Sequence, residues 1–147
     1  MANTVDELPL YGKVREFWDA VSAILGRPGL RGGRDLRGQI ERANDSIEAN
    51  LQEGFEQPTD ASFANFVYIA KGSVAEVMAR THEAHRKRHI TDEDLDQILK
   101  LGEPLGNMMG GFIKYLSASG FTDRGRHAVA PRPAKPVKPR HGRPPTK

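Results

Sequence analysis

Apolar side chains recur at spacings of three and four residues in four stretches of the chain, which is the pattern of amphipathic helices. The first stretch covers residues 10–25 and is followed by the stop signals Gly26 and Pro28. The second begins at Asp35, a candidate N-cap, and continues to Phe55. No stretch shows the strict alternation of a half-buried strand.

Two further helices are predicted in the second half of the chain. The third covers residues 61–84 and is capped by Thr59 or Asp60. The fourth opens with Thr91 and Asp94, whose spacing resembles a capping box with an acidic residue at the third position. Each of these two segments carries a long apolar stripe, so both are predicted to face a common core.

Glycine and proline mark where the helices should be interrupted. Residues 27–34 are rich in helix breakers and are predicted to form a flexible loop, in which Leu30 is at most loosely packed. Pro104 should kink or reset the fourth helix, and Gly120 should end it. Gly72 is expected to allow close backbone approach in the third helix.

The predicted fold class is all-α: an antiparallel up-down four-helix bundle over residues 10–121, preceded by an N-terminal extension, residues 1–9. Residues 122–147 are predicted to be a disordered basic Pro-rich C-terminal tail, because the prolines of residues 131–139 cannot continue a helix. The tail holds eight Lys and Arg residues against one Asp, a net charge of +7. Since the whole chain carries +3, the remaining residues carry −4, so attraction to polyanions should concentrate in the tail.

Basic residues at the end of the third helix and in the tail are the candidate nucleic-acid-binding residues. Residues 140–145, RHGRPP, resemble a degenerate AT-hook, although His141 breaks the spacing of its Arg-Gly-Arg-Pro core. The charge alone predicts about 4–6 non-specific phosphate contacts. The alternative is a tail that only aids solubility. The candidates are Arg86, Lys87, Arg88, Arg132, Lys135, Lys138, Arg140, Arg143 and Lys147.

A strip of polar and small residues borders the apolar faces of the second and third helices. Its residues are Ser46, Asn50, Glu53, Gly54, Gly72, Ser73, Glu76 and Arg80. The favoured interpretation is a hydrogen-bonded network that fixes helix register or a subunit interface, since buried polar groups usually satisfy one another. The alternative is a metal or acid–base site in which Glu53 and Glu76 approach each other as a carboxylate pair.

Other chemistry has little support in the sequence. Cysteine is absent, which excludes disulfides, thiolate metal sites and a thiol nucleophile. No Glu-x-x-His pair of a di-iron bundle occurs, and His82, His85 and His89 share a helix face with strongly basic neighbours that oppose cation binding. Residues 33–38 lack the Lys and Ser or Thr of a phosphate loop. We therefore expect no metal, no cofactor and no enzymatic activity.

The chain also lacks membrane and secretion signals. No window approaches the roughly 18 continuous apolar residues that a membrane-spanning helix needs. The first ten residues do not form a basic start followed by an apolar stretch. We expect no membrane association and a cytoplasmic location.

Three segments carry a resemblance to a known family. Residues 45–55, DSIEANLQEGF, are similar to a Ser-Ile-x-x-Asn-Ile-x-Glu-Gly motif, and residues 70–76, AKGSVAE, to an Ala-x-Gly-Ser-x-x-Glu motif. Residues 105–113, LGNMMGGFI, resemble the final helix of the same family. The chain thus resembles the four-helix bundle proteins related to the 23S rRNA intervening-sequence proteins over roughly residues 10–121, whereas the loop and the tail depart from the family's shorter form.

The resemblance implies a homopentameric barrel of bundles with a central channel and no established enzymatic activity. Some members are encoded inside rRNA intervening sequences, and a structurally similar accessory protein of diversity-generating retroelements works with nucleic acid and a reverse transcriptase. The leading hypothesis is a non-enzymatic oligomeric accessory protein that associates with RNA or DNA through basic loops and the tail. The second is a structural module that binds a protein partner and has no nucleic-acid role. An enzyme that uses the Glu53–Glu76 pair is the third.

Overall fold

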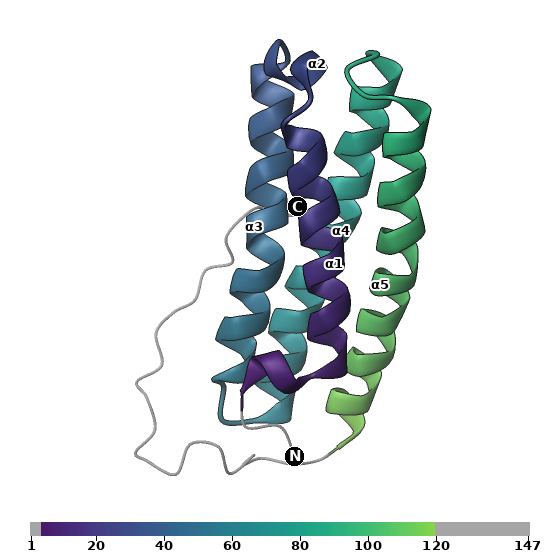
Figure 1. The fold of residues 1–147 in the computed structure, drawn as a ribbon. Coiled ribbons are helices and arrows are strands. Elements are labelled where there is room, and N and C mark those ends of the chain that lie inside the picture. Colours follow the sequence, from purple (N-terminus) through teal and green to yellow (C-terminus); the bar gives the residue numbers. More distant parts are fainter. Residues whose placement is uncertain (1–3, 120–147) are drawn as a thin grey trace, which may run out of the picture.

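The computed structural model describes residues 4–119, apart from the side chain of Arg34, and this part of the chain forms an all-helical bundle (Figure 1). Four long helices run alternately up and down, and each packs against its neighbours in the order α3, α4, α5, α1. The all-α up-down bundle is therefore confirmed. The predicted tail, residues 122–147, lies outside the described residues, as does Gly120. The elements are η1 (Val5–Glu7), α1 (Pro9–Leu25), α2 (Pro28–Arg31), α3 (Arg34–Phe55), α4 (Asp60–Arg86) and α5 (Asp92–Ala118).

The core consists of the apolar stripes of the four long helices. Large side chains from every helix are almost fully buried, and each contributes about 1.5–3 kcal/mol relative to an exposed position. Within residues 4–119, none of the helices combines the length and apolar character that crossing a bilayer requires. The largest of these core side chains include Phe17, Ile40, Ile47, Leu51, Phe63, Ile98, Leu105 and Met109.

The predicted helix caps and boundaries agree closely with the structure. Thr59 accepts a hydrogen bond from the backbone N–H of Ser62 at 3.0 Å, and Thr91 and Asp94 form a complete capping box. The predicted N-cap Asp35 was wrong, because α3 begins at Arg34 with Gly33 as its N-cap, and Asp35 lies in the first turn of the helix. α5 continues through Pro104 as one helix, so the predicted reset does not occur. Pro104 is exposed, which lets water hydrate the carbonyl that its missing N–H leaves unpaired.

Residues 27–34 differ most from their prediction. They contain the single-turn helix α2, and the side chain of Leu30 is completely buried. The flexible-loop interpretation was therefore wrong, because Pro28 begins this turn and Leu30 anchors it in the core. The N-terminal extension also has structure: η1 places Val5 and Leu8 against the core at the other end of the bundle.

Close helix approach depends on two glycines that differ from the predicted one. A Cβ atom added at Gly54 would lie 2.7 Å from Phe66 Cβ, and one at Gly102 would lie 2.9 Å from Phe17 Cε1. A Cβ at Gly72 would meet nothing within 4 Å, so its predicted role in close packing was wrong. Gly72 lies on the exposed side of α4, whereas Gly54 lies on the side of α3 that packs against α4.

Candidate nucleic-acid interface

One end of the bundle is built from two turns that contact each other. Figure 1 shows α2 and the turn between α4 and α5 at the same end. A Cβ added at Gly29 would lie 2.9 Å from the carbonyl carbon of His89, and one at Gly33 would lie 2.9 Å from His89 Nε2. Glycine at both positions therefore lets the α2 turn pack directly on the α4–α5 turn. We call this surface, formed by residues 27–33 and 86–91, the basic end.

A buried carboxylate joins the same two turns. Arg27 donates from Nε to Asp94 Oδ2 at 3.1 Å and from Nη2 to Asp94 Oδ1 at 2.8 Å. These hydrogen bonds hold the pKa of Asp94 below its usual range, against the opposite effect of burial. Because Asp94 also caps α5, one carboxylate fixes the helix start and the position of the α2 turn.

Three arginines of the basic end are exposed and form no ion pair within the described part of the chain. They are Arg31 of α2, Arg86 at the end of α4 and Arg88 in the following turn. Lys87, in contrast, forms an ion pair with Glu83, in which Lys87 Nζ lies 3.2 Å from Glu83 Oε2. Of the cations predicted at this end, Arg86 and Arg88 are thus free to contact a polyanion, and Lys87 is partly neutralised.

Two of these arginines, Arg86 and Arg88, line an open depression that also contains acidic groups. Its volume is about 580 Å³, and Arg86, Arg88, Asp92 and Glu93 line it. His85 Nε2 lies 2.6 Å from Asp92 Oδ1, so this carboxylate has a hydrogen-bonding partner. The mixed charge means that Arg86 and Arg88 attract a phosphate group at this depression, whereas Asp92 and Glu93 repel it.

The remaining predicted nucleic-acid-binding residues lie outside the described residues. They are Arg132, Lys135, Lys138, Arg140, Arg143 and Lys147. The structure therefore leaves the tail prediction untested. Sequence reasoning missed Arg31, although the series of arginines around Gly32 and Gly33 was a signal that this segment was also basic.

The buried half of the polar strip forms the expected hydrogen-bonded network. Ser46 Oγ and Ser73 Oγ share a hydrogen bond at 2.8 Å across the α3–α4 interface. Asn50 Nδ2 donates to the backbone carbonyl of Ser46 at 2.8 Å and to its Oγ at 3.0 Å. All three side chains are buried, so the network fixes the register of α3 against α4.

The alternative interpretation of the strip, a carboxylate pair of Glu53 and Glu76, is wrong. Glu53 and Glu76 are both exposed. Ser46 faces Ser73 in the antiparallel pair of helices, and the two glutamates lie beyond these serines in opposite directions along the bundle. Their separation along the bundle is ten residues of helix, or about 15 Å at 1.5 Å per residue. Two carboxylates this far apart cannot share a proton or a metal ion.

Arg80 completes the polar strip near the basic end. Its Nη1 donates to Glu83 Oε1 at 3.2 Å, while its Nε is buried without a hydrogen-bond partner in the described part of the structure. The strip therefore divides into a buried network of serine and asparagine side chains, the exposed Glu53 and Glu76, and the half-buried Arg80.

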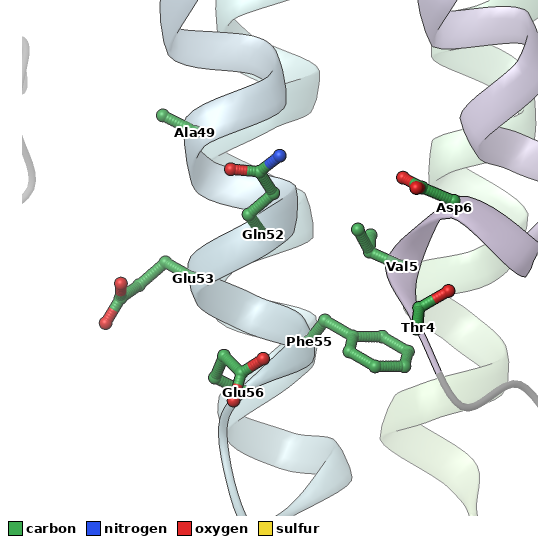
Figure 2. Close-up of a pocket in the computed structure, with 8 residues that line it drawn as sticks. All are labelled: Thr4, Val5, Asp6, Ala49, Gln52, Glu53, Phe55 and Glu56. Carbon is green, nitrogen blue, oxygen red and sulfur yellow. The ribbon is translucent and has the colours of Figure 1, made fainter.

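Glu53 instead borders an acidic depression at the opposite end of the bundle (Figure 2). This depression of about 530 Å³ lies between η1 and α3, and its other carboxylates come from Asp6 and Glu56. Figure 2 shows the Glu53 side chain directed away from Asp6, so the carboxylates do not converge on one point. Within residues 4–119 no group of His, Asp and Glu side chains has the arrangement of a metal site.

Next to this depression, Tyr11 links α1 to α3. Its buried hydroxyl donates to Glu48 Oε2 and accepts from Gln52 Nε2 at 3.3 Å. Burial and the hydrogen bond to Glu48 raise the pKa of Tyr11 to about 12. The phenol therefore stays protonated and holds α1 in place over a wide pH range.

A third surface, which we call the α4–α5 face, exposes large side chains of both helices. The side chains of Tyr68 and Tyr115 are 70% and 67% exposed, and Met108 is also exposed. A depression of about 340 Å³ lies between the two helices, and its lining is mixed: Val74, Ala75, Met78 and Gly106 together with Lys71, Glu103 and Asn107. Large exposed apolar side chains beside such a depression are typical of a protein contact surface.

These observations place the molecule among small antiparallel helical bundles that expose cations at one end. A family model described as 23S rRNA-intervening sequence protein matches residues 7–111, and the chain belongs to this family. The matched region includes both turns of the basic end and the Ser46–Ser73 network, but it does not include the tail. A comparison with curated proteins finds no match.

Proposed function

We propose that this protein is a non-enzymatic accessory protein that associates with RNA or DNA through the basic end and the C-terminal tail. The observation that carries the proposal is the placement of Arg31, Arg86 and Arg88 on two turns in direct contact, exposed and without ion pairs among the described residues. Guanidinium groups bind phosphate oxygens with planar, bidentate geometry, and exposed ones are available for this without breaking an existing pair.

The charge distribution supports local rather than general binding. Outside the tail the chain carries a net charge of −4, and the far end of the bundle exposes carboxylates around the acidic depression. A polyanion is therefore attracted to the basic end and repelled from the opposite end. Such contacts are to the phosphate backbone, so the proposal predicts strong salt dependence and little sequence preference.

The test measures binding of the full chain to fluorescent single-stranded RNA and DNA of mixed sequence by anisotropy, in low salt. One variant replaces Arg31, Arg86 and Arg88 by Gln. A second variant replaces the six candidate binding residues of the tail by Gln, namely Arg132, Lys135, Lys138, Arg140, Arg143 and Lys147. Each variant is expected to bind more weakly than the natural chain. Absence of binding by the natural chain would contradict the proposal, and unchanged binding by the second variant would remove the tail from it.

A matched control separates local contacts from net charge. Arg15, Arg42 and Lys114 are exposed cations on the sides of the bundle, on three different helices, and form no ion pair with described residues. Replacing these three by Gln changes the net charge as much as the substitution at the basic end. The control is expected to bind much more tightly than the basic-end variant, and equal losses would refute a localised interface.

Self-association into a homopentamer is the second part of the proposal. The α4–α5 face offers Tyr68, Tyr115 and Met108 for burial between copies. Five copies would present five basic ends and five tails to one nucleic acid, and multivalency would strengthen weak single contacts. Native mass spectrometry should give a complex near five times the 16.3 kDa chain mass, and the double substitution of Tyr68 and Tyr115 by Lys should dissociate it.

The exposed α4–α5 face also favours one alternative, a structural module that binds another protein and has no nucleic-acid role. Purification without nuclease, followed by native mass spectrometry before and after nuclease treatment, distinguishes the two functions. Co-purified nucleic acid supports the nucleic-acid proposal. A stoichiometric protein partner that persists after nuclease treatment, without bound nucleic acid, supports the alternative.

A further inference from the structure

The turn after α4 holds an arginine in a backbone conformation that favours glycine. Arg88 has φ of 62°, and among residues 4–119 it is the one non-glycine residue with positive φ. The backbone N–H of Arg88 bonds to the carbonyl of His85, and that of His89 bonds to the carbonyl of Ala84, each at 2.9 Å. This is the hydrogen-bond pattern of a Schellman cap, with Arg88 at the left-handed position after the helix.

Stability of the turn does not account for an arginine at this position. In the left-handed region the Cβ atom crowds the following carbonyl, a strain that glycine avoids. Both hydrogen bonds of the cap use backbone atoms, so glycine would keep them. The Arg88 side chain is exposed and forms no ion pair or hydrogen bond with the described part of the chain, so the fold gains nothing visible from its guanidinium.

The same geometry gives the side chain a fixed starting point. The cap fixes the backbone of Arg88, and the contact of Gly29 with the carbonyl of His89 restrains the turn from the other side. A side chain that projects from a rigid backbone loses less freedom on binding than one on a flexible loop. Arg88 also lines the depression at the basic end, as does Arg86.

We propose that Arg88 is a preorganised phosphodiester-binding residue of the basic end, and that its left-handed conformation lowers the stability of the fold in return for a rigid presentation of its guanidinium. This inference rests on the proposed nucleic-acid function and deepens it. Asp92 and Glu93 line the same depression and oppose an anion there, so the proposed contact is between the phosphate and the Arg88 guanidinium, away from these two carboxylates.

The experiment compares the full chain with Arg88→Gly, Arg88→Lys and Arg86→Gly. Urea unfolding measures stability, and anisotropy measures binding to single-stranded RNA and DNA over a series of salt concentrations. Arg88→Gly should shift the unfolding midpoint to higher urea while reducing the slope of log K against log salt by about 0.7, the loss of one phosphate contact on a single strand. Arg88→Lys should keep the slope, because it keeps the charge.

Arg86→Gly is the matched control, because it removes the same charge from a residue in right-handed helix. It should lower the unfolding midpoint, opposite to Arg88→Gly. The inference is overturned if the Arg88→Gly variant is less stable than the natural chain, or if its slope of log K against log salt equals that of the natural chain. The basic-end proposal survives that result if the variant lacking Arg31, Arg86 and Arg88 binds nucleic acid more weakly than the natural chain. The basic-end proposal and the inference about Arg88 both fail if the natural chain binds neither RNA nor DNA.

Discussion

Two glycines in adjacent helices should respond in opposite directions to the same substitution. Gly54 lies between α3 and α4, where an added Cβ would be 2.7 Å from Phe66 Cβ and 2.8 Å from Phe63 Cδ1. The Phe66 Cβ atom is close to its backbone and can move only if α4 moves. Gly72 lies on the exposed side of α4, and an added Cβ there meets nothing within 4 Å.

The expected magnitudes follow from two effects. Alanine improves helix propensity by about 0.5–1 kcal/mol at an unobstructed interior position, so Gly72→Ala should raise the free energy of unfolding by about that amount. Overpacking in a well-filled core costs about 1–3 kcal/mol. At Gly54, next to the last residue of α3, this cost exceeds the smaller propensity gain, so Gly54→Ala should lower the free energy of unfolding by about 1–2 kcal/mol.

Urea unfolding followed by far-ultraviolet circular dichroism measures both changes. The measurements should be repeated at several protein concentrations, since self-association would make the apparent stability depend on concentration. Unchanged m-values would show that the substitutions act on stability rather than on the unfolded ensemble. A Gly54→Ala variant at least as stable as the natural chain would refute the packing argument, and a destabilised Gly72→Ala variant would refute the placement of Gly72 on an open face.

Three further predictions concern polar contacts. A double-mutant cycle of Ser46→Ala and Ser73→Ala should give a coupling free energy of about 0.5–1.5 kcal/mol, and additive effects would contradict their hydrogen bond. The pKa of Asp94 is lowered in the folded state, so its contribution to stability is present above the unfolded pKa of about 3.9 and is lost as pH falls through the folded pKa. Arg27→Gln should reduce this loss of stability in acid, which urea unfolding at a series of pH values measures. The pKa of Tyr11 is raised to about 12, so stability present below pH 10 should fall between about pH 10 and 12, and Tyr11→Phe should remove this part of the alkaline loss. An unaltered alkaline profile in Tyr11→Phe would contradict the assignment.

The features predicted correctly from sequence are those that depend on nearby residues. The four amphipathic helices, the Thr59 cap and the Thr91–Asp94 capping box follow from local spacing, and the structure confirms them. The Ser46–Ser73 network was also foreseen, because polar residues on the core-facing sides of two helices must find partners.

The errors concern relations between distant segments. Glu53 and Glu76 belong to one polar strip in sequence, but the register set by Ser46 and Ser73 carries them in opposite directions along the bundle. Residue spacing within one helix cannot reveal this register, which depends on packing across two helices. Residue spacing also cannot distinguish Gly54, which packs against phenylalanines of α4, from Gly72, which faces solvent.

The basic end was only half predicted for the same reason. Residues 86–88 were recognised because they form a continuous basic run, whereas Arg31 lay in a segment interpreted as a flexible loop. The burial of Leu30 and the contact of Gly29 with His89 bring the two segments together. A composite surface of this kind depends on the docking of two turns that are more than fifty residues apart in the chain.

The salt dependence of nucleic-acid binding tests whether the basic end contacts phosphate. The full chain and the variant in which Gln replaces Arg31, Arg86 and Arg88 are titrated with the same single-stranded RNA at several salt concentrations. We predict that the variant binds more weakly and that the slope of log K against log salt is smaller by about 2, since each phosphate contact on a single strand contributes about 0.7. Equal slopes for the two proteins, or no binding by the natural chain in low salt, would contradict the account.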